Sequence, residues 1–346
     1  MQDQATPDRY HRQVRFAPLG ESGQRRLLAS RVLICGCGAL GSVAADLLVR
    51  AGVGMVRIVD RDFLEADNLH RQVLFDEADV AAELPKAVAA AQRLRQVNSS
   101  IAVEPMGGDL TAATIRQIAA GADLIVDGTD NFETRYLIND FAVETGTPWV
   151  FGGCIGAEGQ ALAILPGQTP CLACLIPEPP PPESQPTCET AGVIGPIVTM
   201  IASLQAAESL KILSGAMDFV NRRMSVVDLW HGDLKTIGVG RTDDSADCRA
   251  CSRRDFPWLD GRRGVAAIAL CGRNAVQLAP AAPGRISLPE LAEKLRRVGR
   301  VTGNDYLLRL EVDEFRLTIF ADGRTIVSGT SDLAEARAVH ARIVGG

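Results

Sequence analysis

The pattern of apolar and polar residues changes with a regular rhythm between about residue 31 and residue 151. Short continuous apolar runs, which are typical of buried strands, alternate with longer stretches that have apolar residues at helical spacing. Strands are predicted at 32–35, 56–59, 101–104, 124–126 and 149–151, and helices from residue 42 and at 86–97, 111–120 and 134–145. Strands that alternate with helices of this length predict an α/β fold with a mostly parallel sheet and helices on both faces.

The pattern differs on both sides of this region. The apolar runs 161–165 and 225–229 predict an antiparallel extension of the sheet, and a long helical pattern covers 194–213. Beyond residue 263, strand and helix patterns on a smaller scale predict an α+β unit. We therefore expect three parts, which are an N-terminal helical arm (1–30), a main domain (31–262) and a small auxiliary domain (263–346).

A glycine-rich turn follows the first predicted strand. Gly36, Gly38 and Gly41 form the pattern G-x-G-x-x-G at the start of a helix, where backbone N–H groups and the helix dipole favour a bound phosphate. Asp60 follows the second strand, at the place where Rossmann-like folds keep a carboxylate for a ribose hydroxyl. These residues predict a nucleotide site at the carboxyl ends of the strands.

Two cations distinguish this site from a simple dinucleotide site. Arg71 lies in the segment DNLHRQ (67–72) and Lys86 in the segment LPK (84–86). The pyrophosphate of a dinucleotide is held mainly by backbone N–H groups, whereas Arg and Lys together favour a triphosphate whose charge is neutralised during a reaction. An NAD-dependent oxidoreductase on the same fold is the alternative, and it leaves the two cations unexplained.

The segment DGTDN (127–131) follows another predicted strand end. A carboxylate there, such as that of Asp130, suits a magnesium ligand beside the phosphates. Asp130 could instead cap the N-terminus of the following helix, and the segment taken alone favours this second interpretation.

Four of the nine cysteines form two C-x-x-C pairs, Cys171 with Cys174 and Cys248 with Cys251. Together they can complete a tetrahedral thiolate site for a structural zinc ion. Two redox motifs or four buried cysteines are the alternatives. Cys188 lies outside these pairs and precedes a predicted helix, whose dipole would favour a thiolate, so it is either a nucleophile or a surface cysteine without a role.

Composition limits the class of protein. Of the 346 residues, 47% are hydrophobic and 23% are charged, and the net charge of −6 argues against a general nucleic-acid binder. We expect no membrane span, because no apolar run of about 18 residues occurs. The first ten residues lack the apolar segment of a secretory signal, so a cytoplasmic location is expected.

Several of these motifs resemble those of one family when they are taken together. They are RYHRQ (9–13), GCGALGS (36–42), AGVG (51–54), DNLHRQ, LPK, DGTDN, the two C-x-x-C pairs and TCETAG (187–192). In this arrangement they closely resemble the ThiF/MoeB/HesA family, which is related to ubiquitin-activating enzymes. The resemblance covers about residues 9–252, and the segment LCGRNAVQL (270–278) resembles the C-terminal extension of some members.

The resemblance implies an activity and its partners. Enzymes of this family use magnesium and ATP to adenylate the C-terminal glycine of a ubiquitin-fold sulfur-carrier protein that ends in Gly-Gly, and they release pyrophosphate. The carrier serves thiamine or molybdopterin biosynthesis. No rhodanese-like domain follows in this chain, so a separate protein is expected to donate the sulfur.

The resemblance also implies roles for single residues. Arg12 matches an arginine that reaches the phosphates in the partner subunit, which implies a homodimer, and Cys188 matches a cysteine that forms a thioester or acyl-disulfide with the carrier. The four paired cysteines match zinc ligands, and Asp130 matches a magnesium ligand. The implied catalytic residues are Arg12, Arg71, Lys86, Asp130 and Cys188. The implied nucleotide-binding residues are Gly36, Gly38, Ala39, Gly41, Asp60, Asn68, Arg71, Gln72, Lys86, Asp130 and Asn131.

Overall fold

A computed structural model describes residues 8–180, 188–240, 247–264, 267–270, 274–278 and 286–345, without the side chains of residues 188–189 and 267–270. The chain divides into two compact units, Met1–Arg263 and Gly264–Gly346. Each unit has hydrophobic core clusters of its own.

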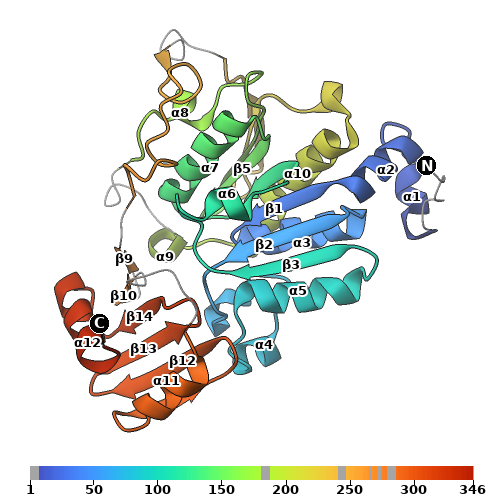
Figure 1. Ribbon diagram of the computed structural model, residues 1–346. Coiled ribbons are helices and arrows are strands. Elements are labelled where there is room, and N and C mark those ends of the chain that lie inside the picture. Colours follow the sequence, from blue (N-terminus) through green and yellow to red (C-terminus); the bar gives the residue numbers. More distant parts are fainter. Residues whose placement is uncertain are drawn as a thin grey trace. The chain divides into compact units, whose positions relative to one another are not determined.

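The first unit contains a sheet of eight strands, β1 (Arg31–Cys35), β2 (Met55–Asp60), β3 (Ala102–Gly107), β4 (Leu124–Asp127), β5 (Trp149–Ile155), β6 (Glu158–Ile164), β7 (Met224–Asp228) and β8 (Asp233–Ile237). Their order across the sheet is β3-β2-β1-β4-β5-β6-β7-β8, and Figure 1 shows β3, β2 and β1 side by side. Strands β1 to β5 pair in parallel, and β5 to β8 pair antiparallel. The predicted parallel sheet with an antiparallel extension is confirmed.

Five helices pack on this sheet, α3 (Ala39–Ala51), α5 (Lys86–Val97), α6 (Ile115–Ile118), α7 (Phe132–Thr145) and α10 (Gly195–Ser214). Alternate residues of β1 face two different core clusters, as the period of a strand requires. Val32 and Ile34 join the cluster that contains α3, α5 and α10. Leu33 and Cys35 join the cluster that contains α6 and α7. Helices therefore cover both faces of the sheet.

Helix α10 has 20 residues and is apolar enough to cross a membrane by length and composition. Half of its most apolar window is buried inside the protein. There it packs against α3, β5 and β6. Several apolar residues of α10 thus belong to the hydrophobic core of the first unit.

Helix α6 and strand β8 differ from the prediction. The helix expected at 111–120 has only one turn, α6, because the hydroxyl of Thr114 bonds to the backbone of Thr111 and Asp109 before that turn. Strand β8 was not predicted, since all five of its residues are exposed and give no apolar run.

The remaining helices that the structure describes in this unit have ten residues or fewer. They are η1 (Asp8–Tyr10), α1 (His11–Val14), α2 (Gly20–Ala29), η2 (Ala66–Asn68), α4 (Glu77–Ala81), α8 (Leu172–Leu175), α9 (Cys188–Ala191) and η4 (Met217–Phe219).

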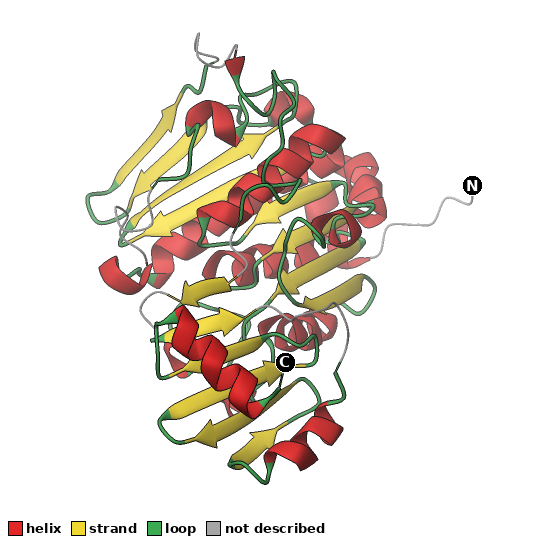
Figure 2. Ribbon diagram, turned by 60° about the vertical axis from the view of Figure 1, so that its left-hand side comes forward, coloured by secondary structure: helices red, strands yellow, loops and turns green. Residues whose placement is uncertain are grey.

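The second unit is an antiparallel sheet with two helices, α11 (Leu288–Leu295) and α12 (Leu333–Ile343). The strands are β9 (Ala267–Leu270), β10 (Ala275–Leu278), β11 (Arg300–Gly303), β12 (Leu307–Val312), β13 (Phe315–Phe320) and β14 (Thr325–Ser328), in the order β11-β12-β13-β14-β10-β9. Both helices share one core cluster with the sheet, and Figure 2 shows α12, which ends near the C-terminus, lying across the sheet. The predicted α+β unit is confirmed, although strands β10 and β11 were not predicted.

Candidate functional site

Three glycines hold two strand ends and the start of a helix in contact. Gly36 follows β1 with a φ of +85°, a conformation that favours glycine. A Cβ atom on Gly41 would lie 1.8 Å from the carbonyl oxygen of Gly36, and one on Gly128 would lie 2.4 Å from the same oxygen. Side chains at these positions would force β1, α3 and β4 apart. The turn therefore also depends on Gly128, which lies outside the G-x-G-x-x-G motif.

The N-terminus of α3 has space and polar groups for a ligand. A Cβ atom on Gly38 would meet only the side-chain nitrogen of Gln72, at 3.9 Å. Gln72 is buried, and its Oε1 atom has no hydrogen-bond partner among the described residues. Helix α3, which begins at Ala39, has no side-chain cap. An uncapped helix N-terminus beside an unpaired buried amide fits a nucleotide.

Asp60 ends β2 beside this turn and is mostly buried. Its carboxylate accepts hydrogen bonds from the backbone N–H groups of Cys37, at 2.5 Å, and of Asp62, at 2.7 Å. Burial raises the pKa of Asp60 above its ordinary value, against the opposing effect of the Lys86 charge. The carboxylate is thus fixed at the place where Rossmann-like folds bind ribose hydroxyls.

Lys86 begins α5 and lies almost fully buried near the same strand end. Its ammonium group lies 3.2 Å from a carboxylate oxygen of Asp62, and its backbone N–H donates to the carbonyl oxygen of Asp62. Arg61 forms an ion pair with Asp109 at 3.2 Å. The sequence prediction did not include Asp62, Arg61 or Asp109, although they lie at or just after the ends of β2 and β3.

The segment after Asp67 adds a buried amide and a second cation. Asn68 is 1% exposed and donates to the carboxylate of Asp67 at 2.9 Å. Arg71 donates to the carbonyl oxygen of Asp67 at 2.7 Å and faces an open groove of about 530 Å³. The groove is lined by His70, Arg71, Val73, Gly195, Pro196, Thr199 and Met200.

The 127–131 loop connects β4 to α7. The Oδ1 atom of Asn131 accepts the backbone N–H of Thr134 at 2.8 Å and caps α7. Asp130 is exposed in the preceding position. The capping interpretation for Asp130 is therefore wrong, because Asn131 takes that role and leaves the Asp130 carboxylate outside the cap.

Arg12 lies at the far end of α3 from the glycine-rich turn. It is exposed on α1, and the preceding Tyr10 packs on the last turn of α3, since a Cβ atom on Gly52 would lie 2.4 Å from the Tyr10 ring. The Tyr10 hydroxyl also accepts a hydrogen bond from Asn98 at 2.8 Å. Helix α3 has 13 residues. Its two ends are therefore about 20 Å apart, so Arg12 is not brought to the nucleotide site of its own chain.

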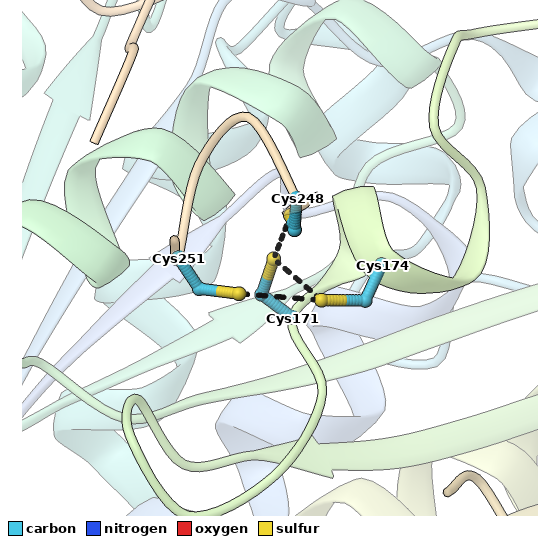
Figure 3. A group of neighbouring side chains, drawn as sticks. All are labelled: Cys171, Cys174, Cys248 and Cys251. Atoms are coloured by element: carbon cyan, nitrogen blue, oxygen red, sulfur yellow. Dashed lines mark hydrogen bonds between the residues drawn. The ribbon is translucent and has the colours of Figure 1, made fainter. Parts of the chain in front are cut away.

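The four cysteines of the two C-x-x-C pairs point toward a common centre (Figure 3). Their sulfur atoms all lie within 4.8 Å of one another. Cys171 lies 3.7 Å from both Cys174 and Cys248, and Cys174 lies 3.3 Å from Cys251. A tetrahedral zinc site with Zn–S distances of about 2.3 Å requires sulfur separations of about 3.8 Å. The cluster fits such an ion with small adjustments.

Helix α7 holds both cysteine pairs in place. The Oδ1 atom of Asn139 accepts the backbone N–H of Leu172, between the first two cysteines, at 2.8 Å. Asp140 forms an ion pair with Arg249, between the other two, at 2.9 Å. Cys188, by contrast, begins the short helix α9, and its side chain lies outside the described part of the chain.

This fold and site define a nucleotide-binding α/β enzyme with a separate thiolate cluster. Residues 10–250 match the ThiF family, and the chain therefore belongs to that family.

Curated relatives specify the reaction class. The sulfur carrier protein ThiS adenylyltransferase of Bacillus subtilis is 41% identical over 338 residues, which cover 97% of this chain and 99% of that protein. The sulfur carrier protein adenylyltransferase of Thermus thermophilus is 45% identical over 246 residues, or 70% of this chain and 90% of that protein. The adenylyltransferase and sulfurtransferase MOCS3 of Bos taurus is 39% identical, with 71% of this chain matching 53% of its length. This chain is accordingly an adenylyltransferase, and the oxidoreductase alternative is not supported.

Solved structures support the fold. A crystal structure of E. coli MccB aligns with a TM-score of 0.61 and 23% identity, over 71% of this chain and 75% of that chain. At this identity the similarity concerns the fold alone.

Proposed function

We propose that this enzyme adenylates the C-terminal glycine of a ubiquitin-fold sulfur-carrier protein that ends in Gly-Gly. The observation that carries the proposal is the buried ammonium group of Lys86 beside Asp62 and Asp60, at the strand end next to the glycine-rich turn. A buried cation at this place is suited to neutralising phosphate charge in a displacement reaction.

Each predicted residue has a role in this proposal. Asp60 binds the ribose, the N-terminus of α3 receives phosphate oxygens, and Arg71 and Lys86 balance their charge. Asn68 and Gln72 supply buried amides beside the phosphates. Magnesium, held through Asp130 beside Asn131, would offset further phosphate charge when it is bound.

The proposed reaction needs no general base. The C-terminal carboxylate of a carrier has a pKa of about 3.5 and is already ionised at neutral pH. Its oxygen attacks the α-phosphorus of ATP, an acyl–phosphate bond forms, and the bond to pyrophosphate breaks. The protein contributes alignment and charge stabilisation, and these two effects are what the site offers.

The position of Arg12 supports a homodimer. Because Arg12 lies about 20 Å along α3 from its own turn, we propose that it acts in the site of the partner subunit. A two-fold symmetric pair would then have two equivalent shared sites.

The four clustered cysteines are proposed to hold a structural zinc ion that ties the segment around residues 248–251 to the segment around residues 171–174, within the first unit. Cys188 is proposed to attack the adenylated glycine of the carrier, so that a thioester forms as the acyl–phosphate bond breaks and AMP leaves. A separate protein is proposed to donate the sulfur. We propose a carrier of thiamine biosynthesis, supported by the full-length similarity to the Bacillus subtilis relative, with a molybdopterin carrier as the second candidate. The expected location is the cytoplasm.

Carrier-dependent exchange of labelled pyrophosphate into ATP tests this proposal. We expect exchange with the wild-type protein and one Gly-Gly carrier from the same genome, and a loss of at least about a hundredfold in Asp130→Ala. Wild-type exchange in Asp130→Ala would refute the role of Asp130. Tight binding of NAD without binding of ATP would refute the proposed reaction.

A further inference from the structure

Arg135 makes three polar contacts close to the nucleotide site, and its side chain is largely buried. Its side chain is 9% exposed, and its Nε atom lies 3.0 Å from a carboxylate oxygen of Asp127, which is fully buried. Its Nη2 atom donates to the carbonyl oxygens of Thr129, at 2.8 Å, and of Gly152, at 2.9 Å. One guanidinium group therefore connects α7, the 127–131 loop and β5.

The rest of the Asp127 side chain is also engaged. Its second carboxylate oxygen accepts the backbone N–H of Thr129 at 2.9 Å and the hydroxyl of Thr129 at 2.7 Å. From the opposite face of the sheet, Gln205 on α10 donates to the backbone carbonyl oxygen of Asp127 at 2.7 Å. The chain is thus fixed on both sides immediately before Asp130.

Stability alone is a weak reason for such an arrangement. Burying an ion pair costs desolvation energy that its attraction often only balances, so an apolar pair would serve the core equally well. A planar guanidinium with several donors, however, fixes the direction of each bond it makes. Hydrogen bonds made to a metal ligand orient it, and their loss typically weakens metal binding ten- to a hundredfold. The bonds of Arg135 act one step further away, on the loop that carries Asp130.

We propose that Arg135 is a positioning residue, which holds the 127–131 loop so that Asp130 presents its carboxylate to the metal ion of the bound nucleotide. This inference rests on the proposed role of Asp130. In this proposal Arg135 contacts neither the nucleotide nor the ion.

Arg57 offers a matched control. It also bonds to one carboxylate, that of Glu104 at 2.9 Å, and to two backbone carbonyl oxygens, those of Ile118 at 2.6 Å and Ala120 at 3.1 Å. These contacts join β2, β3 and the end of α6, and none of them involves the 127–131 loop. Arg57→Lys should therefore show how much stability is lost when a guanidinium network is removed while the nucleotide site stays intact.

The test is a titration of Mn²⁺ by electron paramagnetic resonance, with the full-length protein and a non-hydrolysable ATP analogue, combined with pyrophosphate exchange. In Arg135→Lys we expect a dissociation constant for Mn²⁺ about tenfold higher. We also expect kcat to be about a hundredfold lower at saturating ATP and carrier. Arg57→Lys should leave the Mn²⁺ constant unchanged, with a smaller loss of thermal stability because its ion pair is more exposed.

A milder variant keeps the test decisive if Arg135→Lys fails to fold. Thr129→Val removes only the hydroxyl that donates to Asp127 and should shift the Mn²⁺ constant in the same direction by a smaller factor. Unchanged Mn²⁺ constants in Thr129→Val, and in Arg135→Lys where it folds, would overturn the inference while Asp130→Ala stays inactive. Full exchange in Asp130→Ala would instead refute the proposed function of Asp130.

Discussion

Mixing two inactive variants should restore activity if Arg12 acts in the site of the partner subunit. Arg12→Ala keeps Asp130 in its own site but cannot complete the site of its partner. Asp130→Ala has a defective site of its own but still carries Arg12. A mixed dimer would therefore contain one complete site, built from Asp130 of one chain and Arg12 of the other.

The expected magnitude follows from the geometry and from random association. The Tyr10 anchor places Arg12 at the end of α3, about 20 Å from the turn of its own chain, which is much longer than an arginine side chain. Equal amounts of two chains form mixed dimers in half of all cases, and each mixed dimer has one complete site of two. The mixture should therefore recover about one quarter of the wild-type activity.

The assay is carrier-dependent pyrophosphate exchange after the subunits have been allowed to exchange. A chain with both substitutions, mixed with an equal amount of wild type, is the matched control. In that mixture action between subunits leaves about one quarter of the activity, whereas action within one subunit leaves about one half. No recovery from the two single variants, in a sample where mixed dimers are shown to form, would refute the role of Arg12 between subunits.

Three further outcomes follow from the structure. Gly41→Ala should lower the free energy of unfolding, measured by urea denaturation, by about 1–3 kcal/mol or more, because its Cβ would meet a backbone carbonyl oxygen at 1.8 Å. Gly38→Ala has space for a Cβ, so it should keep the wild-type stability and weaken ATP binding. Equal losses of stability in the two variants would contradict the reasoning. Cys248→Ser should lose bound zinc by elemental analysis and lower the thermal midpoint, whereas an unchanged zinc content would contradict the thiolate site. Burial raises the pKa of Asp140 to about 6. Because an unfolded Asp ionises near pH 4, the folded state loses about 3 kcal/mol of stability as the pH rises from about 4 to about 6. Asp140→Asn should flatten this fall in the free energy of unfolding, and an unchanged slope would contradict the shift.

The parts of the fold that the sequence predicts are those with a buried periodic pattern. The helix predicted at 86–97 matches α5 at both ends, because Pro85 directly precedes it and a buried apolar face runs along it. Strand β1 could be predicted for the same reason, since four of its five residues are buried and form a short apolar run. Strand β8 has no buried face and therefore left no signal.

The candidate site divides in a similar way. The positions of Asp60 and Lys86 near the glycine-rich turn could be predicted, because they lie at strand and helix ends next to recognisable motifs. The role proposed for Arg135 could not be predicted, because it depends on contacts with Asp127, Thr129 and Gly152 that only the packed sheet creates. The link from α7 to the cysteine cluster is also invisible in the sequence, since Asp140 and Arg249 lie 109 positions apart.

Mass spectrometry of the carrier tests the central proposal most directly. The purified enzyme is incubated with ATP, magnesium and a Gly-Gly carrier from the same genome, with Asp130→Ala as the parallel sample. We expect the carrier to gain one adenylyl group on its C-terminal glycine with the wild-type enzyme and none with the variant. An unmodified carrier in every wild-type reaction, with all candidate carriers of that genome tested, would contradict the proposed function.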